Sequence, residues 1–193
     1  MNTSRFFRTT DWKVTEMGDF ILPETWWSRP YEYLWASLMI QKGEIVLDAG
    51  CGIEHPFKFY LGRFCTAYAC DNDPNIGKVI IPADCNLTID YADITDLPYP
   101  YKLFDKVFCI SVLEHLDPES RRDALLEFYQ VLKPGGKLIM TLDYPTSDPQ
   151  ELAGMLKDCG FSFAGEVDFA IPDDAISIGD LKCYRVVCVK GGE

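Results

Sequence analysis

A strand pattern that runs directly into a glycine turn constrains the fold of this chain more than any other feature. Three branched apolar residues open the segment Ile45-Val46-Leu47-Asp48-Ala49-Gly50-Cys51-Gly52, as in a parallel strand covered on both faces. The two glycines let the backbone turn sharply and approach a ligand without a Cβ in the way. Asp48 stands where the strand ends, so we expect its carboxylate in the crevice at the carboxyl ends of the strands. A ligand here should offer hydrogen-bond donors or positive charge.

The same turn disfavours a dinucleotide as the ligand. The dinucleotide fingerprint G-x-G-x-x-G requires a third glycine, whereas this chain reads Gly50-Cys51-Gly52-Ile53-Glu54-His55. An acid beside a pyrophosphate is also electrostatically unfavourable in a partly desolvated crevice. S-adenosylmethionine has no phosphate and carries an ammonium and a sulfonium, so it suits the acidic turn better.

Four segments together resemble the class I S-adenosylmethionine-dependent methyltransferases. The first is Val46 to Gly52, and the others follow in the order and spacing of that family, over a region of about 45–190. The resemblance implies an α/β fold, a Rossmann-like three-layer α/β/α sandwich whose seven-stranded sheet is mostly parallel with an antiparallel last strand. It also implies that the methionyl part of the cofactor is received by the turn residues Asp48, Ala49, Gly50, Cys51 and Gly52.

The second segment, 66–74, has the pattern of a short strand that ends in an acid. Asp71 follows Gly52 at close to the ~20-residue interval at which a carboxylate meets a ribose hydroxyl. Asp71 resembles the ribose-binding residue of the family, and Asn72 beside it belongs to the same implied site. Asp73 precedes a proline in a typical turn sequence, so it is interpreted as structural.

The third and fourth segments supply the rest of the implied cofactor site. In 91–99, Asp93 resembles the acid that accepts from the adenine amino group, and the backbone amide of Ile94 meets a ring nitrogen. In 103–116, a further strand ends at a turn that lies beside the transferred methyl group in the family. The resemblance therefore places Ser111 and Val112 along the cofactor or the substrate.

His115, in the same turn, is the candidate general base because imidazole can take up a proton near neutral pH. The alternative is that it packs or hydrogen-bonds locally beneath the helix that Asp117 and Pro118 open. Methyl transfer needs mainly proximity, alignment and desolvation, so a base is required only if the acceptor must lose a proton. No metal site is indicated, because His55 lacks the second histidine four residues on that a zinc-protease helix requires.

An aromatic-rich segment precedes the glycine turn and divides the chain into a predicted cap, 1–42, and a cofactor-binding domain, 43–193. Aromatic residues at helical spacing usually pack onto a core, so one interpretation is a helix that covers the sheet. The alternative is a lid over the methyl donor, in which Tyr33 or Trp35 contacts the cofactor and Arg29 binds an anionic group.

One departure from the family concerns Glu54, which stands where many members have a third glycine. With Pro56 as the first helical residue, Glu54 lies near the positive end of a helix dipole, so the turn is still expected to form. Glu54 then either points toward the methionine ammonium or narrows the pocket.

Charge and composition restrict the partners. A net charge of −12 disfavours a nucleic acid, because binding to a phosphate backbone draws on clusters of lysine and arginine. The basic residues near the start, Arg5, Arg8 and Lys13, are interpreted as a solvated tail, and the alternative is a local basic patch. Small-molecule or saccharide acceptors, or a protein partner, are favoured instead. The longest apolar runs are too short for a bilayer and the start lacks an apolar secretory region, which predicts a cytoplasmic protein without a membrane partner.

The eight cysteines lie mostly in predicted strands or turns and form no C-x-x-C pair, so we expect reduced thiols. Two other functions stay open at this level. A non-catalytic S-adenosylmethionine-binding subunit that partners another methyltransferase would carry the same motifs. A nicotinamide-dependent reductase would share the sheet, although the missing glycine counts against it. No motif specifies the acceptor, the atom methylated or the oligomeric state.

Overall fold

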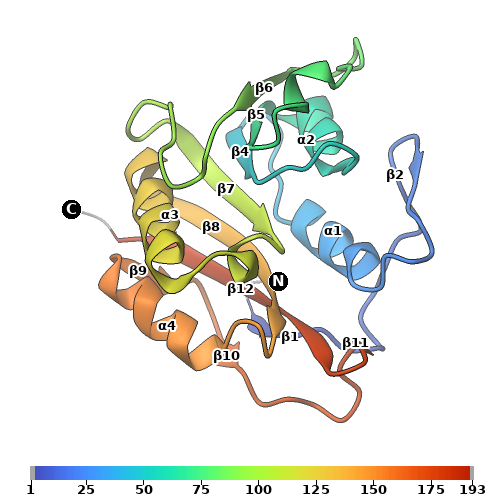
Figure 1. The fold of residues 1–193 in the computed structure, drawn as a ribbon, viewed down its shortest axis with the longest axis vertical. Coiled ribbons are helices and arrows are strands. Elements are labelled where there is room, and N and C mark those ends of the chain that lie inside the picture. The colour runs from blue at the N-terminus through green and yellow to red at the C-terminus, as the bar shows by residue number, and fades with distance from the viewer. Residues whose placement is uncertain (1–2, 192–193) are drawn as a thin grey trace.

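A set of adjacent parallel strands forms the centre of the molecule (Figure 1). A computed structural model describes residues 3–191, so residues 1–2 and 192–193, at the outer ends of the two predicted ranges, lie outside the description. The parallel strands run in the order β8-β7-β4-β5-β6. They are β4 (Ile45–Ala49), β5 (Thr66–Asp71), β6 (Leu87–Tyr91), β7 (Phe104–Ile110) and β8 (Leu132–Tyr144). Because β4 lies in the middle, the glycine turn that follows it opens at the centre of the carboxyl edge.

The sheet continues beyond β8 with strands from the end of the chain. β12 (Leu181–Lys190) runs antiparallel to β8 and also pairs with β9 (Phe161–Phe163). These two strands complete the predicted arrangement of a mostly parallel sheet with an antiparallel last strand. The sequence did not predict the strands that extend the sheet to ten, which are β1 (Ser4–Phe6), β10 (Val167–Asp168) and β11 (Ser177–Ile178). A separate two-stranded hairpin consists of β2 (Glu16–Met17) and β3 (Phe20–Ile21).

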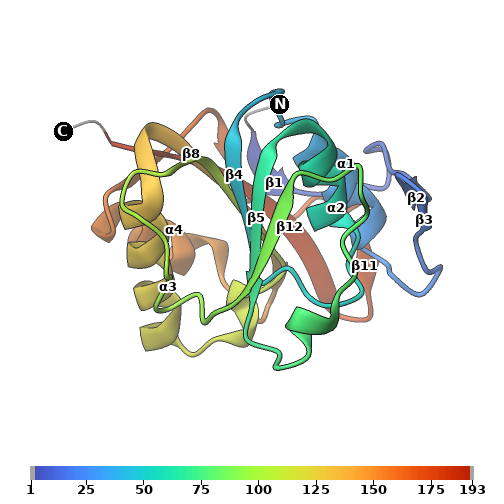
Figure 2. The same ribbon diagram turned by 90° about the horizontal axis from the view of Figure 1, so that it is seen from above.

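Helices cover both faces of the sheet, which confirms the predicted three-layer sandwich (Figure 2). On one face lie α3 (Pro118–Val131) and α4 (Pro149–Asp158), and on the other α1 (Arg29–Ser37) and α2 (Phe57–Phe64). Two short 3-10 helices, η1 (Ile76–Lys78) and η2 (Leu113–His115), follow β5 and β7. None of the helices within residues 3–191 is long and apolar enough to cross a membrane.

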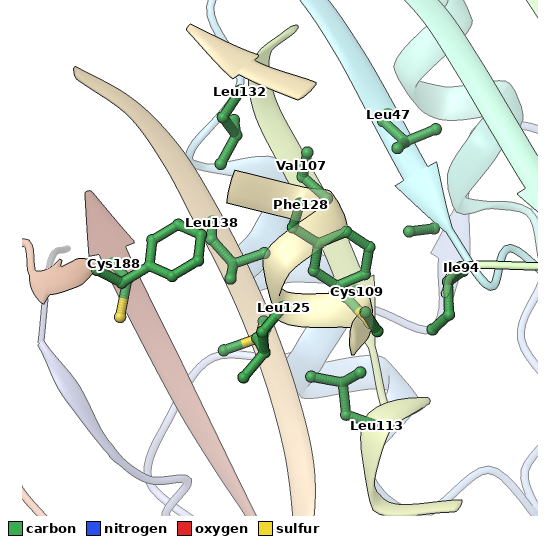
Figure 3. Packing of buried hydrophobic residues seen from close by; sticks show 14 of the residues in the cluster. Leu47, Ile94, Val107, Cys109, Leu113, Leu125, Phe128, Leu132, Leu138 and Cys188 are labelled. Atoms are coloured by element: carbon green, nitrogen blue, oxygen red, sulfur yellow. The ribbon is translucent and has the colours of Figure 1, made fainter. Parts of the chain in front are cut away.

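The core beneath α3 holds β4 and β7 in place. Asp117 caps the helix as predicted, since its Oδ1 accepts from the backbone N–H groups of Glu119 and Ser120, both at 3.0 Å. Leu125 and Phe128, one turn apart on α3, have no exposed surface and pack against the strands. Figure 3 shows this cluster, which also contains Leu47, Val107, Leu138 and the free thiols Cys109 and Cys188. This packing fixes the two strands whose ends carry the candidate site.

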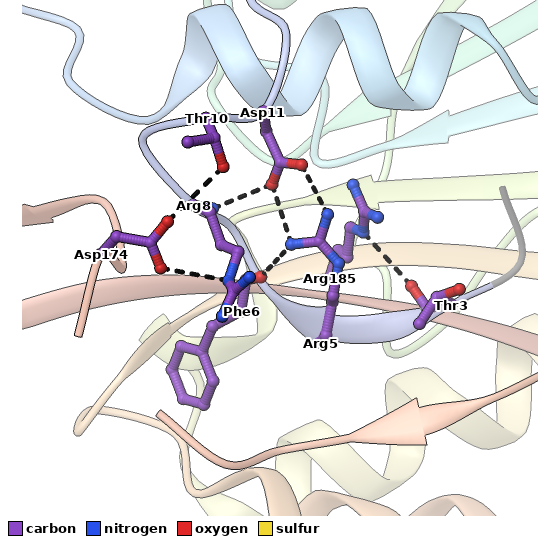
Figure 4. A network of polar contacts seen from close by, with 8 residues as sticks. All are labelled: Thr3, Arg5, Phe6, Arg8, Thr10, Asp11, Asp174 and Arg185. Atoms are coloured by element: carbon purple, nitrogen blue, oxygen red, sulfur yellow. Dashed lines mark hydrogen bonds and ion pairs between the residues drawn. The ribbon is translucent and has the colours of Figure 1, made fainter. Parts of the chain in front are cut away.

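The start of the chain is a strand and not the solvated tail that its charges predicted. β1 pairs antiparallel with β12 and parallel with β10, and Phe6 is 1% exposed. Figure 4 shows that both arginines form ion pairs. Arg5 donates to both carboxylate oxygens of Asp11, at 2.9 and 2.5 Å, and Arg8 pairs with Asp174 at 3.1 Å. The prediction was wrong because the strand partners come from the opposite end of the chain. The division of the chain at residue 42 stays a prediction.

Candidate functional site

The turn after β4 has a conformation that favours glycine at two positions. Gly50 and Gly52 have φ values of +73° and +59°, in the left-handed region that side chains rarely adopt. A Cβ on Gly50 would lie 2.7 Å from both Cγ atoms of Val112, and one on Gly52 would lie 2.5 Å from Cδ2 of His55. The two glycines therefore bring the turn directly against the loop after β7 and against His55.

A buried lysine holds this turn, which lacks the third glycine. Lys58 on α2 has no exposed surface, and its Nζ donates to the carbonyl oxygens of Gly52 at 2.6 Å, Ile53 at 3.0 Å and His55 at 2.6 Å. An ammonium has three N–H donors, so it can satisfy all three carbonyls at once. Burial lowers the pKa of Lys58, and the acids beyond the turn favour its charged form. The sequence analysis missed this residue, for which a lysine between two phenylalanines was the only indication.

A cavity of about 360 Å³ lies at the carboxyl ends of β4, β5 and β7. Predicted residues from all four segments line it: Gly50, Asp71, Asn72, Asp93, Ile94, Ser111, Val112 and His115, together with Ala92 and Leu116. These segments meet because neighbouring parallel strands end at the same edge of the sheet. The lining combines acids with aliphatic side chains, a combination that suits ribose hydroxyls and an apolar base surface.

The two acids of this cavity are held in place by hydrogen bonds. Asp71 accepts from the N–H of Gly52 at 2.8 Å through Oδ2 and from the N–H of Asp73 at 3.0 Å through Oδ1. Asp93 Oδ1 accepts from the N–H and the hydroxyl of Thr95, at 2.9 and 2.8 Å, and these bonds lower the pKa of Asp93. A carboxylate has about four acceptor sites, so Asp71 can still accept from ribose hydroxyls.

A smaller cavity of about 90 Å³ shares Gly50 and Ser111 with the first. Its other lining residues include three that were predicted to receive the methionyl group, and they are Asp48, Cys51, Gly52, Arg29, Tyr33, His55, Phe57 and Ile110. Ala49, the remaining residue predicted for this turn, is buried in the core beneath it. Glu54 is exposed and lines neither cavity, so it does not narrow them.

The electrostatics of the smaller cavity favour a cation. Asp48 is 4% exposed, and burial raises its pKa to about 7. The nearby Asp71 charge acts in the same direction, whereas Lys58 and Arg29 oppose it. A positive group beside Asp48 would favour the ionised carboxylate. The residues present therefore fit the ammonium of a methionyl group.

Helix α1 is fastened to the sheet by a fully buried acid. Glu32 accepts from the hydroxyls of Ser111 at 2.5 Å and Thr141 at 2.6 Å, and it pairs with Arg29 at 2.6 Å. These partners lower the pKa of Glu32 although burial acts strongly in the opposite direction. The segment is therefore a helix that covers the sheet, as one interpretation predicted, and it also contributes Arg29 and Tyr33 to the smaller cavity. Sequence analysis did not assign a role to Glu32.

The alternative contact residue on this helix, Trp35, lies elsewhere. Its ring packs edge-on against Phe7 at 5.8 Å between centroids, and it lines neither of the two cavities. Tyr33 instead shares a hydrogen bond of 2.6 Å with Nδ1 of His55, whose ring stacks on Trp26 at 4.5 Å. Burial lowers the pKa of His55 to about 4, so the ring is neutral near pH 7.

His115, the predicted candidate base, is exposed and lines the larger cavity but not the smaller one. Its position places it beside the residues predicted for adenosine rather than beside Asp48. A catalytic role for His115 stays a prediction.

Comparisons with known proteins agree with this geometry. Residues 47–140 match the family described as Methyltransferase domain. The chain is 35% identical over 106 residues to the tRNA (carboxymethyluridine(34)-5-O)-methyltransferase of Arabidopsis thaliana. This alignment covers 53% of this chain and 25% of that relative. It is 30% identical over 183 residues to the sterol 24-C-methyltransferase of Saccharomyces cerevisiae. This second alignment covers 77% of this chain and 47% of that relative. The chain thus spans between a quarter and about half of the length of these relatives.

Solved structures share the fold. A TehB-like S-adenosylmethionine-dependent methyltransferase from Corynebacterium glutamicum aligns with a TM-score of 0.66 at 18% identity, over 82% of this chain and 86% of that one. Residues 47–140 thus match a methyltransferase domain, and the chain has the fold of solved S-adenosylmethionine-dependent methyltransferases. The methyltransferase-domain match contains every residue that lines the larger cavity, whereas Arg29 and Tyr33 of the smaller cavity lie outside it. The N-terminal part of the chain therefore supplies lining residues that the matched domain does not contain.

Proposed function

We propose that this chain transfers a methyl group from S-adenosylmethionine to a small-molecule or saccharide acceptor. The observation that carries this proposal is the pair of adjoining cavities, which share Gly50 and Ser111. In the larger cavity, Asp71 and Asp93 would hold the adenosine. In the smaller cavity, Asp48 and the backbone of the glycine turn would hold the methionyl part.

Methyl transfer from a sulfonium requires the protein mainly to bind and align the two reactants. The bound cofactor supplies an activated methyl group on a sulfonium, which an O, N, S or C nucleophile can accept. The chain's own residues fix the two ends of the site, since Lys58 holds the glycine turn and Glu32 holds the turn at Ser111. Such alignment can supply several orders of magnitude in rate. Ser111, which borders both cavities, marks the region where donor and acceptor would meet.

The acceptor class is supported by the cap and by charge. Helix α1 lies against the carboxyl edge of the sheet through the bonds of Glu32, and its residues Arg29 and Tyr33 line the smaller cavity. A helix packed beside the donor site restricts the space around it, which favours a small molecule or a sugar over a large folded partner. The net charge of −12 further disfavours a phosphate backbone.

Isothermal titration calorimetry with S-adenosylmethionine and S-adenosylhomocysteine tests the cofactor assignment. We expect both to bind, and Asp71→Asn to weaken binding about tenfold because a carboxylate acceptor for the ribose is lost. Asp73→Asn is the matched control, since Asp73 Oδ1 serves the N–H of Asn75 in the adjacent turn. Equal affinity of Asp71→Asn and the parent would refute the ribose role. Release of S-adenosylhomocysteine across an acceptor panel then tests turnover.

A further inference from the structure

Two acids near the candidate site have oxygen atoms without a hydrogen-bond partner. Glu114 is 4% exposed, and neither Oε1 nor Oε2 has a partner; the same holds for Oδ1 of Asp143. Within residues 3–191, the indole nitrogen of Trp35 is the only other buried side-chain nitrogen or oxygen in this condition. Buried polar atoms are nearly always hydrogen-bonded in folded proteins, so three unsatisfied oxygens on two neighbouring elements require an explanation.

Both acids stand at the carboxyl edge of the sheet, on segments connected to the Ser111 turn, and neither lines the two cavities described above. The hydroxyls of Ser111 and Thr141 donate to the same oxygen of Glu32, at 2.5 and 2.6 Å. Glu114 lies in η2, which begins two residues after Ser111. Asp143 lies two residues after Thr141 on β8, the strand that pairs with β7. Side chains alternate along a strand, so Asp143 lies on the same face as Thr141.

Arg121 on α3 joins the two elements that carry these acids. Its Nε donates to the carbonyl oxygen of Leu113 at 3.1 Å, and its Nη1 donates to the hydroxyl of Ser147 at 3.3 Å. The N–H of Ser147 donates in turn to the carbonyl oxygen of Asp143 at 2.8 Å. The turn that carries Glu114 and the end of β8 are therefore held together, while the guanidinium itself serves carbonyl and hydroxyl oxygens.

The unsatisfied oxygens call for a ligand with N–H donors and positive charge. Burial raises the pKa of Glu114 to about 8 and that of Asp143 to about 6, and it outweighs the groups that lower them, which are the backbone N–H of Glu114, the Cys183 thiol and the Arg29 charge. A primary ammonium has three N–H donors, which matches the three unpartnered carboxylate oxygens. The chain's net charge of −12 also attracts cations.

We propose that the methyl acceptor is an amine whose nitrogen is bound by Glu114 and Asp143, and that the Glu114 carboxylate takes up its proton. This inference rests on the proposed function, since it assigns the acceptor side of the same site. Glu114 is a catalytic residue in this scheme, and Asp143 is the counter-charge of the bound nitrogen.

The step balances without a further reactant. The acceptor enters as an ammonium and transfers one proton to the Glu114 carboxylate, which frees the nitrogen lone pair. That lone pair forms a bond to the methyl carbon while the carbon–sulfur bond breaks, and the electron pair of the broken bond stays on sulfur. The products are a thioether, S-adenosylhomocysteine, and a methylated ammonium that carries the positive charge. Half-buried Asp143 faces this charge, and the proton on Glu114 returns to solvent when the product leaves.

The groups around Glu114 decide how its charge depends on pH. Burial is the largest cause of its raised pKa, Asp143 and Glu32 add to it, and Arg29 and the backbone N–H of Glu114 itself oppose it. Burial also raises the pKa of the other groups that face it, which stay neutral near pH 8 and are Cys109, Cys183 and Tyr184. We therefore expect kcat/KM for an amine to rise with pH through the region near 8.

The decisive experiment follows the Glu114 carboxyl directly, by ¹³C NMR on protein labelled at glutamate and saturated with S-adenosylhomocysteine. Glu114→Gln assigns the resonance. Methylammonium chloride is the probe, and potassium chloride at equal ionic strength is the reference. We expect methylammonium to lower the pKa of Glu114 by about one pH unit or more, because a cation beside a carboxyl favours its ionised form. An identical titration in both salts overturns the proposal.

Variants separate proton transfer from binding. With amines and their matched alcohols as acceptors, we expect the amines to be methylated. Glu114→Gln should lower kcat for the amine about 100-fold and should abolish the rise of kcat/KM with pH. Asp143→Asn should raise KM for the amine more than it lowers kcat. Exposed Glu119→Gln, on the first turn of α3, is the matched control and should behave like the parent. Methylation of alcohols but not amines, or an unchanged pH profile in Glu114→Gln, overturns the proposal.

Failure of this inference can be told apart from failure of the proposed function. Binding of S-adenosylmethionine with no specific response of Glu114 to methylammonium removes the amine and keeps the methyltransferase. Absence of calorimetric binding of both cofactor forms to the parent protein removes the proposed function, and this inference with it.

Discussion

Two sets of acids lie at the carboxyl edge of the sheet, and they differ in how completely their oxygens are hydrogen-bonded. Asp71, at the end of β5, and Asp93, in the loop after β6, accept from backbone N–H groups before any ligand is bound. Glu114 and Asp143, beside the ends of β7 and β8, keep three oxygens without a partner. The first set is prepared to accept further bonds from neutral hydroxyl and amino groups. The second set lacks donors, which indicates a ligand that brings its own donors and charge.

Glu32 shows that burial alone does not cause this difference. It is more buried than Glu114, yet Arg29, Ser111 and Thr141 all donate to it and lower its pKa. Glu114 lies near the same charges and has an elevated pKa of about 8. The comparison teaches that donors, and not depth, decide whether an acid at this edge is charged.

Removal of Glu32 should have the largest effect on stability. Glu32→Ala leaves Arg29 without its counter-charge and leaves two buried hydroxyls without their acceptor. Breaking a buried ion pair from one side costs about 3–5 kcal/mol. At this chain length that corresponds to a fall in Tm of about 10 °C, measured by differential scanning calorimetry.

The matched control for this prediction removes both charges at once. Arg29→Met combined with Glu32→Leu leaves no unpaired charge, so it should recover much of the lost stability. A Glu32→Ala protein that melts with the parent would show that satisfied donors at this position contribute nothing, and the comparison of the acids would lose its reference point.

Because of the acids with raised pKa values, the free energy of unfolding of the ligand-free protein should decrease as the pH becomes alkaline. The pKa of Glu114 is raised from 4.5 to about 8, so the folded protein keeps a proton that the unfolded chain releases. That stabilisation is fully present below pH 4.5 and is lost as the pH rises through 8. Asp48 and Asp143, with pKa values raised to about 7 and about 6, act with the same sign at lower pH.

Comparison of the parent with Glu114→Gln between pH 6.5 and 8.5 isolates this effect, because His55 and Asp48, which also titrate in part over this interval, are common to both proteins. Over this interval Glu114 should cost the folded state about 2 kcal/mol, at ~1.4 kcal/mol per pH unit. Urea unfolding at each pH measures the loss, and Glu114→Gln should reduce it by this amount. The control Glu119→Gln should keep the parental slope, and a flat profile in the parent would remove the distinction between the two sets.

The cofactor side of the site could be predicted from the sequence because its determinants are local. Asp48, Asp71 and Asp93 each come at or shortly after the end of a strand, and parallel strands bring such ends to one edge. The glycine turn is equally local, since its positive φ values are favoured by the residue type itself. The fold was predicted from the family resemblance that these local motifs carry.

The proposed acceptor side and the ends of the sheet could not be predicted, because they depend on contacts between distant parts of the chain. Glu32 is hydrogen-bonded to Ser111 and Thr141, which lie 79 and 109 residues away in the sequence, and no local sequence pattern predicts either bond. Strand β1 pairs with residues 167–168 and 184–185, so its charges suggested a tail. For Glu114, the informative property is an absence of donors, which only the folded arrangement creates.

The smallest expected effect concerns an acid that is satisfied locally and away from the edge. Asp148 caps α4, where its Oδ1 accepts from the N–H groups of Gln150 at 2.8 Å and Glu151 at 3.1 Å. Asp148→Ala should cost about 1 kcal/mol, or about 3 °C in Tm, because two helix N–H groups lose their acceptor. Asp148→Asn should cost much less, since asparagine caps as well as aspartate. Because Asp148 acts through backbone donors that its own helix provides, neither variant should change the pH slope that Glu114 sets. A change in that slope would mean that charge, and not donor supply, is what separates the acids of this protein.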